Sequence, residues 1–196
     1  KYYDKYEFLK LLNLNNINYK FKVVFHLGAC SSTTNFDKDY MIKNNFEYSK
    51  SLLNWSQNNN IPFIYASSAS VYGQYKKIVN ENTQMNPLNP YALSKKLFDD
   101  YVLENINNFS NSVVGLRYFN VYGPNEFHKK NMSSPLIKFR EQLLYNNKIK
   151  IFGKYDGYDE GEHSRDFISV EDCVNINIFF YQNLKNGIYN VGTGIS

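Results

Sequence analysis

The stretch that decides the fold is Ile61-Pro-Phe-Ile-Tyr-Ala-Ser-Ser68, an apolar run that ends in two serines. A short, continuously apolar run that opens with proline is typical of a strand buried on both faces of a parallel sheet. We expect this strand to end at Ala66, so that Ser67 and Ser68 follow it directly. Parallel α/β sheets bind ligands at the carboxyl ends of their strands, which makes both hydroxyls candidate site residues.

Strands and helices are predicted to alternate along the rest of the chain, which favours a doubly wound parallel sheet with helices on both faces. We therefore predict an α/β fold with a Rossmann-type sheet in residues 1–119. Residues 120–196 would form most of a smaller substrate-binding lobe that is interleaved with the first domain. The pattern predicts strands over 21–27, 61–66, 112–118, 149–152 and 188–191, and helices over 40–59, 91–106, 134–145 and 170–183.

The glycine-rich turn of a nucleotide-binding sheet does not occur in this sequence. Such a sheet ordinarily opens with a strand, a glycine-rich turn and a helix that holds the pyrophosphate. No G-x-G-x-x-G is present in the 196 residues, and Gly192-Thr-Gly194 has no helix after it. We therefore expect a partial fold, from which the first βαβ unit of ~30 residues or more is missing and whose second lobe is cut short.

The composition argues against several classes of protein. The net charge is +4, and the lysines are scattered or paired rather than clustered, which argues against a nucleic-acid-binding protein. Two cysteines and three histidines lie far apart, so we predict no metal site and a reduced, cytoplasmic protein. No apolar run approaches the length of a membrane span.

A tyrosine and a lysine stand four residues apart in Pro90-Tyr-Ala-Leu-Ser-Lys95, at the start of a predicted helix. This spacing places Tyr91 and Lys95 on one face of the helix, one turn apart. A nearby ammonium group favours the phenolate, so we expect the pKa of Tyr91 to be lowered. The pair would then be a general acid or base for an alcohol proton. Such a pair also arises by chance, and the serines upstream are what favour a site.

The order strand, serine, tyrosine and lysine resembles that of the extended short-chain dehydrogenase/reductases. In that superfamily the serine and the tyrosine contact a sugar hydroxyl, and the lysine binds the nicotinamide ribose. The resemblance therefore implies catalytic roles for Ser68, Tyr91 and Lys95. Ser68 is favoured over Ser67 because it directly precedes the phrase Ala-x-x-Tyr-Gly.

Three separated phrases are similar to those of one family in this group, the ADP-glycero-manno-heptose 6-epimerases. They are HLGACSSTT at 26–34, RYFNVYGPNEFHK at 117–129 and RDFISV at 165–170. This resemblance covers nearly the whole chain. It implies NADP as the cofactor, with NAD possible, an ADP-heptose as the substrate, and a homo-oligomer, in this family a pentamer.

The resemblance also implies the mechanism of an epimerisation that supplies a sugar for lipopolysaccharide core synthesis. NADP would take a hydride from C6 of the heptose and return it to the other face of the ketone. Tyr91 and Lys129 would donate and accept the proton on opposite faces of C6. From the residues alone, however, Lys129 is a solvated loop lysine. The implied cofactor contacts are Lys5, Leu27, Gly28, Ala29, Cys30, Ser31, Asn44, Val121, Tyr91, Lys95 and Lys129.

The implied substrate contacts match the family less evenly. Asn131 stands where a small hydroxyl residue is expected, and Lys138 stands where some members carry histidine. The full set implied by the resemblance is Ser68, Asn120, Asn131, Lys138, Phe152 and Arg165.

Other functions stay open at this point. A UDP-hexose 4-epimerase shares the serine, tyrosine and lysine but not the Cys-Ser-Ser-Thr-Thr and His-Lys phrases. A dTDP-sugar dehydratase needs an Asp-Glu pair after the strand serine, where this chain has Ala69-Ser70. The missing glycine-rich turn also fits an inactive remnant or a binding module, and we expect this chain alone to bind NADP poorly and to be inactive.

Overall fold

The structure is a computed structural model of the chain, and it describes residues 1–14, 20–74, 78–154 and 157–195. The chain forms two compact units. The first contains Lys1–Arg117 and Ile176–Asn190, and the second contains Tyr118–Asn175 and Val191–Ser196. The chain therefore leaves the first unit after Arg117 and returns to it for one further segment.

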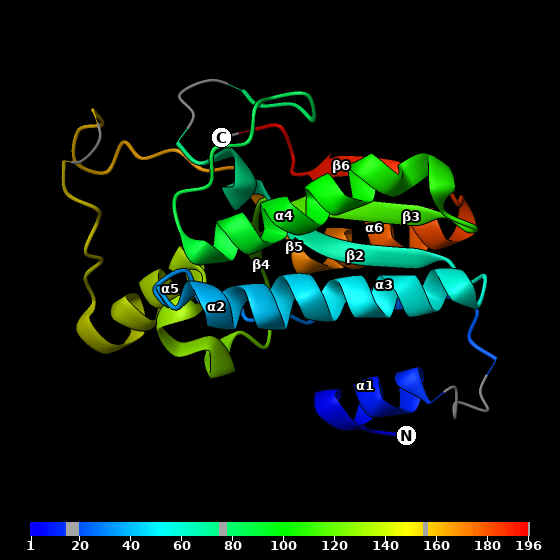
Figure 1. Ribbon diagram of the computed structural model, residues 1–196. Helices are drawn as coiled ribbons and strands as arrows, with labels where there is room; N and C mark the ends of the chain where they lie inside the picture. The colour runs from blue at the N-terminus through cyan, green and yellow to red at the C-terminus, as the bar shows by residue number, and fades with distance from the viewer. Residues whose placement is uncertain (15–19, 75–77, 155–156, 196) are drawn as a thin grey trace. The chain divides into compact units, whose positions relative to one another are not determined.

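The first unit is built on a sheet of four strands in the order β1-β2-β3-β6 (Figure 1). β1 and β2 are parallel, with Val24 opposite Phe63 and His26 opposite Tyr65. This sheet confirms the predicted α/β fold. The strands are β1 (Val24–His26), β2 (Phe63–Ser68), β3 (Val113–Tyr118) and β6 (Gly187–Val191).

Helices cover both faces of this sheet. In Figure 1, α3 and α4 lie in front of the sheet and α6 lies behind it. Neighbouring residues of β1 show the two faces, because His26 bonds to Ser49 of α3 whereas the ring of Phe25 lies 6.2 Å from that of Tyr181 in α6. The helices are α1 (Lys5–Asn13), α2 (Lys38–Met41), α3 (Tyr48–Asn58), α4 (Pro90–Asn105) and α6 (Val170–Gln182). Shorter helices are the π-helical η1 (Ile42–Glu47) and the 3₁₀ turns η2 (Ala69–Tyr72) and η3 (Ile106–Asn108).

The start of α4 is set by its local sequence. The side chain of Asn89 accepts a hydrogen bond of 2.8 Å from the amide of Ala92, and Pro90 occupies the first helical position. An asparagine cap followed by proline is a strong start signal for a helix. The next turns bury Phe98 and Val102 against Tyr65 of β2. Tyr91 is thereby fixed in the first turn of a well-anchored helix.

The second unit contains a pair of short parallel strands and two helices. β4 (Asn120–Tyr122) pairs with β5 (Phe167–Ser169), η4 spans Phe127–Met132, and α5 spans Pro135–Asn146. Asp166 holds the segment after β6 within this unit, because its carboxylate accepts hydrogen bonds of 2.9 Å from the amides of Thr193 and Gly194. Its carbonyl oxygen accepts a bond of 2.8 Å from the side chain of Asn120.

Several element predictions were wrong. The strand expected over 149–152 does not form, because Ile151 and Phe152 are 61% and 57% exposed and the apolar run is not buried in a sheet. β2 continues to Ser68 instead of ending at Ala66. The sequence pattern also missed α1, β4 and β5, and each of these two strands has only three residues.

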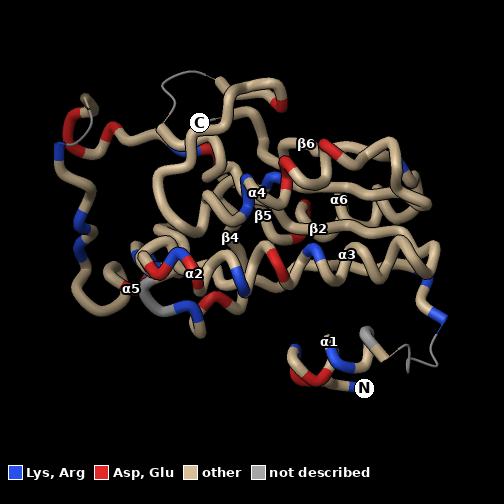
Figure 2. The backbone as a smooth tube through the Cα atoms, viewed as in Figure 1, with Lys and Arg blue, Asp and Glu red and all other residues tan. Residues whose placement is uncertain are grey.

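Charged residues of both signs are interspersed along the described chain, as Figure 2 shows. Within the described residues, no helix is both long and apolar enough to cross a bilayer. The same residues contain no group of three or more His, Cys, Asp or Glu side chains arranged to hold a metal ion.

Gly115 in β3 lies directly against Tyr65 of β2. A Cβ at position 115 would lie 2.5 Å from the hydroxyl oxygen of Tyr65 and 2.6 Å from its Cζ. We expect Gly115→Ala to lower the free energy of unfolding by about 1–3 kcal/mol, because the buried ring must move. Urea denaturation measures this change. Gly28→Ala is the matched control, since nothing lies within 4 Å of the added methyl, and an equal loss in both variants would contradict the prediction.

Candidate active site

The loop after β1 and the end of β2 lie at the same edge of the sheet. His26 and Tyr65 are opposite one another in parallel strands, so the residues after each strand emerge together. Leu27, Gly28 and Cys30 follow β1, and Ser68 ends β2. The structure thus brings together candidates that are about forty residues apart in the sequence.

Asn45 of η1 holds the loop after β1 in place. Its side chain accepts a hydrogen bond of 2.8 Å from the amide of Cys30 and donates one of 3.0 Å to the carbonyl oxygen of Cys30. It also lies 3.0 Å from Oγ of Ser94 in α4. Sequence reasoning singled out Asn44 and missed this role of Asn45. A π-helical turn inside a longer helix is the structural feature that marks it.

The two serines of β2 point in opposite directions, as successive residues of a strand do. Ser67 is buried and donates a hydrogen bond of 2.9 Å to the carboxylate of Asp99. Ser68 is only half-buried, and its oxygen accepts bonds from the amide and the hydroxyl of Ser70, at 3.2 and 2.9 Å. Its side chain is also hydrogen-bonded to Tyr91. Strand geometry therefore favours Ser68 over Ser67 as the site serine.

Tyr91 has a raised pKa in this structure, whereas the sequence analysis expected a lowered one. Burial raises the pKa most, the hydrogen bond to Ser68 lowers it, and Cys30 raises it. The ammonium of Lys95 lies 6.0 Å from the centre of the Tyr91 ring. The expected direction was wrong because spacing on a helix does not include the cost of removing a phenolate from water.

Lys95 is buried, with 7% of its surface exposed. Its Nζ donates a hydrogen bond of 2.7 Å to the carbonyl oxygen of Ala66 in β2. Burial lowers the pKa of Lys95 to about 8, and the charge of Asp99 acts in the opposite direction. A buried lysine beside a tyrosine and a serine at the end of a strand is a functional-site arrangement.

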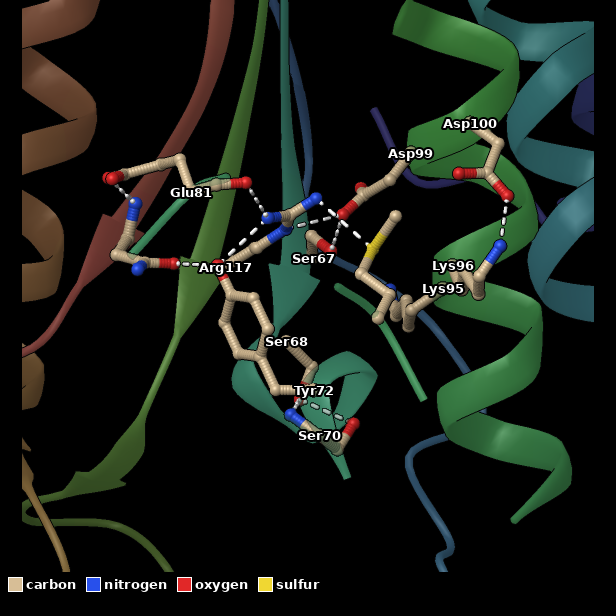
Figure 3. A network of polar contacts seen from close by, with 12 residues as sticks. Ser67, Ser68, Ser70, Tyr72, Glu81, Lys95, Lys96, Asp99, Asp100 and Arg117 are labelled. Carbon is tan, nitrogen blue, oxygen red and sulfur yellow. Dashed lines mark hydrogen bonds and ion pairs between the residues drawn. The ribbon is translucent and has the colours of Figure 1, made fainter. Parts of the chain in front are cut away.

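A buried ion pair lies beneath these residues (Figure 3). The carboxylate of Asp99 in α4 accepts hydrogen bonds from Tyr65 at 2.9 Å, Ser67 at 2.9 Å and Nε of Arg117 at 2.8 Å. Both charged side chains are almost fully buried. The sequence analysis did not identify this pair, although Asp99 lies one helical turn after Lys95.

Arg117 extends this network to β6, the strand at one edge of the sheet. Its guanidinium donates to the hydroxyl of Tyr72 at 2.8 Å, and that hydroxyl donates to the side chain of Asn190 in β6 at 2.6 Å. The amide of Asn190 donates in turn to the carboxylate of Glu81 at 2.8 Å. The network therefore links α4, β2, β3, η2 and β6 in the first unit.

His26 predicts a pH dependence of stability. Burial lowers the pKa of His26 to about 4, and the charge of Lys95 acts in the same direction. The unfolded chain then binds the extra proton between pH 6.5 and about 4. We expect the free energy of unfolding to fall on the order of 3 kcal/mol through this one group as the pH drops across that window.

Urea denaturation at pH 7 and pH 4.5 measures this effect. His26→Gln should lose this part of the pH dependence, whereas His128→Gln, which removes an exposed imidazole, should keep it. Identical pH dependence in the wild type and in His26→Gln would refute the prediction.

Two further cofactor candidates meet in the first unit. The ammonium of Lys5 in α1 donates a hydrogen bond to the side chain of Asn44 in η1. Thirty-nine positions separate these residues in the sequence. The structure therefore brings this pair together, although their role in binding a cofactor stays a prediction.

Lys129 lies in the second unit beside an anchored carboxylate. Glu126 is buried and accepts hydrogen bonds from the amide of Gly123 at 3.0 Å and from the amide of Ser134 at 2.8 Å. Burial alone would raise the pKa of Glu126, but these bonds and the charge of Lys129 outweigh it and lower the pKa. Nζ of Lys129 lies 3.7 Å from this carboxylate and is partly exposed.

The candidate substrate contacts other than Ser68 also belong to the second unit. Lys138 lines a pocket of 390 Å³ together with Phe127 and Tyr145. Phe152 instead packs near His163, with ring centres 5.9 Å apart. The guanidinium of Arg165 donates to the carbonyl oxygen of Ser164. Val121 is in β4, and the side chain of Asn131 lies outside the described part of the chain.

The comparison with family models gives the decisive observation. The model described as "NAD dependent epimerase/dehydratase family" matches residues 8–192. The chain belongs to this family. The matched range includes Ser68, Tyr91, Lys95 and Lys129.

Individual members of the epimerase/dehydratase family extend the comparison. The chain is 46% identical over 194 residues to an ADP-L-glycero-D-manno-heptose-6-epimerase of Alkalilimnicola ehrlichii, which covers 98% of this chain and 61% of that protein. A crystal structure of the Helicobacter pylori ADP-L-glycero-D-manno-heptose-6-epimerase is 35% identical, with a TM-score of 0.85 over 97% of this chain and 58% of that one. The UDP-N-acetylglucosamine 4-epimerase of Methanobrevibacter ruminantium is 31% identical, with a TM-score of 0.81 over 94% of this chain and 59% of that one. This chain thus spans about three fifths of the length of these relatives.

The residues present fit one half of the nicotinamide dinucleotide that the family description implies. A buried lysine, a tyrosine and a serine surround the end of β2, which suits a ribose and a reacting sugar hydroxyl. Gly28 leaves open space beside the loop after β1. The sequence contains no glycine-rich turn to cradle a pyrophosphate, so the fit concerns the nicotinamide half.

Proposed function

We propose that this chain carries the catalytic residues of an ADP-L-glycero-D-manno-heptose 6-epimerase. The observation that carries the proposal is the 46% identity to such an enzyme over 98% of this chain. The hydrogen bond between Ser68 and Tyr91, with Lys95 buried beside them, supports it independently. The reaction is the interconversion of the D-glycero and L-glycero forms of the ADP-heptose at C6.

Tyr91 is the general base and acid for the C6 hydroxyl in this proposal. On one face of C6, Tyr91 in its deprotonated form accepts the hydroxyl proton as the alcohol becomes a ketone, and in the reverse direction it protonates the alkoxide as the same epimer re-forms. Ser68 donates a hydrogen bond to the same oxygen and orients it. Bound nicotinamide dinucleotide supplies the acceptance and return of a hydride.

Epimerisation needs a second group that gives and takes a proton, because the hydride leaves one face of C6 and returns to the other face. We assign this role to Lys129, whose ammonium is held next to Glu126 in the second unit. Three hydrogen bonds fix the carboxylate of Glu126, so Lys129 has a rigid anionic neighbour. Asn120, Asn131, Lys138, Phe152 and Arg165 are proposed to bind the ADP-heptose.

NADP is the proposed form of the cofactor. The bonded pair Lys5 and Asn44 supports this choice, since an ammonium group favours a 2′-phosphate. Neither Cys30 nor Cys173 forms a disulfide, which agrees with a reducing compartment such as the cytoplasm. A homo-oligomer, a pentamer by family resemblance, completes the proposal.

The test uses the full reading frame that contains this chain. The protein is incubated with NADP and ADP-D-glycero-D-manno-heptose, and the configuration at C6 is followed by proton NMR. NAD replaces NADP in one arm, and UDP-glucose replaces the heptose in another. Conversion of the heptose supports the proposal, and turnover of UDP-glucose alone would assign the chain to the 4-epimerases.

Residues 1–196 alone form a separate arm of the same experiment. We expect this chain to bind NADP poorly and to show no turnover, because it lacks a pyrophosphate-binding turn. Silence of the full reading frame with both sugars would favour a binding module without catalysis.

A further inference from the structure

Ser68 lies where β2 passes directly into the 3₁₀ turn η2. It is the last residue of the strand and the cap of the turn, and its backbone is extended, with φ of −152° and ψ of 141°. The turn brings the amide and the hydroxyl of Ser70 within hydrogen-bond distance of Oγ of Ser68. The two distances are 3.2 Å and 2.9 Å (Figure 3). One serine therefore donates twice to a single oxygen atom of another.

These two bonds use the whole acceptor capacity of the Ser68 hydroxyl. A serine hydroxyl has one proton to donate and two lone pairs with which to accept. The amide of Ser70 takes one lone pair and the hydroxyl of Ser70 takes the other. Toward Tyr91 or a sugar, Ser68 therefore acts with its own proton, as a hydrogen-bond donor. A hydroxyl group that accepts hydrogen bonds is polarised by them, which makes it a stronger donor.

The turn that carries Ser70 is firmly anchored. Its next two residues, Val71 and Tyr72, are 0% and 2% exposed. The hydroxyl of Tyr72 also accepts a hydrogen bond of 2.8 Å from Arg117. Ser70 itself is only half-buried. The turn thus holds Ser70 in a fixed place beside Ser68, and the Ser70 side chain can be changed without opening the core.

We propose that Ser70 is a positioning residue that acts through Ser68. Its amide and hydroxyl fix the Ser68 side chain in one rotamer and direct the Ser68 proton toward the reacting sugar oxygen. This inference rests on the proposed function, in which Ser68 donates a hydrogen bond to that oxygen. It gives a role to a residue that the sequence analysis used only as a departure from the dehydratase pattern.

The first part of the test needs neither cofactor nor sugar. Crystal structures are determined of the protein from the full reading frame, as the wild type, Ser70→Ala and Ser70→Thr. We expect a single Ser68 rotamer in the wild type and in Ser70→Thr, which keeps the hydroxyl. In Ser70→Ala one lone pair of Ser68 loses its donor, so we expect Oγ of Ser68 to occupy a second rotamer. An unchanged single rotamer in Ser70→Ala would overturn the proposal.

The second part measures ADP-heptose epimerisation at saturating NADP. Ser70→Ala is expected to lower kcat roughly two- to ten-fold, the effect of one lost hydrogen bond, with little change in KM. Ser70→Thr should recover most of this loss. Ser51→Ala is the matched control, because the Ser51 hydroxyl donates a bond of 2.9 Å to the carbonyl oxygen of Glu47 on exposed helix surface. Its kcat should equal that of the wild type.

A double variant decides whether Ser70 acts through Ser68. Ser68→Ala alone should lower kcat on the order of 10²-fold, as the loss of one donor to a reacting oxygen does. If Ser70 acts through Ser68, then Ser68→Ala/Ser70→Ala is no slower than Ser68→Ala. A further loss in the double variant, as large as that of Ser70→Ala in the wild type, would show an independent structural role and refute the inference.

The two parts separate this inference from the proposed function. If the full reading frame turned over no sugar, the epimerase proposal would fail, and the Ser68 rotamers would still decide whether Ser70 positions Ser68. If the wild type epimerised the heptose and Ser70→Ala were equally fast, the epimerase would stand and Ser70 would have no positioning role.

Discussion

Tyr91→Phe in the full reading frame is expected to lower kcat for ADP-heptose epimerisation by ~10³-fold, because general acid–base catalysis contributes 10²–10⁴-fold. The variant removes only the hydroxyl that bonds to Ser68. The ring stays in place in the first turn of α4, so KM for the sugar should change little. Initial rates from the NMR assay of C6 configuration, at saturating NADP, measure both constants.

Tyr101→Phe is the matched control for this prediction. Tyr101 lies on the same helix, and its hydroxyl donates a hydrogen bond of 2.8 Å to the side chain of Asn54. The change removes one tyrosine hydroxyl without touching the candidate site, so activity should be retained. If Tyr91→Phe epimerised the heptose as fast as Tyr101→Phe, Tyr91 would have no role in proton transfer.

Arg117→Gln is expected to lower the free energy of unfolding by about 3–5 kcal/mol, the usual cost of breaking a buried ion pair by removing one partner. Asp99 would be left in the core with its charge unpaired, because Nε of Arg117 lies 2.8 Å from it. The hydrogen bond from the guanidinium to Tyr72 would be lost as well. Urea denaturation at pH 7 measures the change.

Two comparisons define the origin of this effect. Lys96→Gln breaks the exposed pair with Asp100, and its cost should be below about 1 kcal/mol. Asp99→Asn/Arg117→Gln removes both buried charges and should recover part of the loss. A double variant as unstable as the sum of both single variants would show that Asp99 and Arg117 do not stabilise each other.

The fold class could be predicted because its signal is local. Continuous apolar runs such as 61–66 and 112–118 predicted buried strands, and the asparagine–proline start of α4 is a local signal for a helix. The order of Ser68, Tyr91 and Lys95 along the chain likewise suggested one site. The run at 149–152 misled the same reasoning, because an apolar pattern does not reveal that its side chains stay exposed.

The sequence by itself determined that this is an α/β chain with a serine, a tyrosine and a lysine at the edge of a parallel sheet. Only the tertiary structure decided which lysine and which aspartate of α4 are buried, and that the pKa of Tyr91 is raised. In Lys95-Lys-Leu-Phe-Asp-Asp100, Lys95 and Asp99 are buried, whereas Lys96 and Asp100, which have the same spacing, are about one third exposed. Burial, hydrogen-bond partners and the local dielectric come from strands distant in the sequence, and these set the charge of each group.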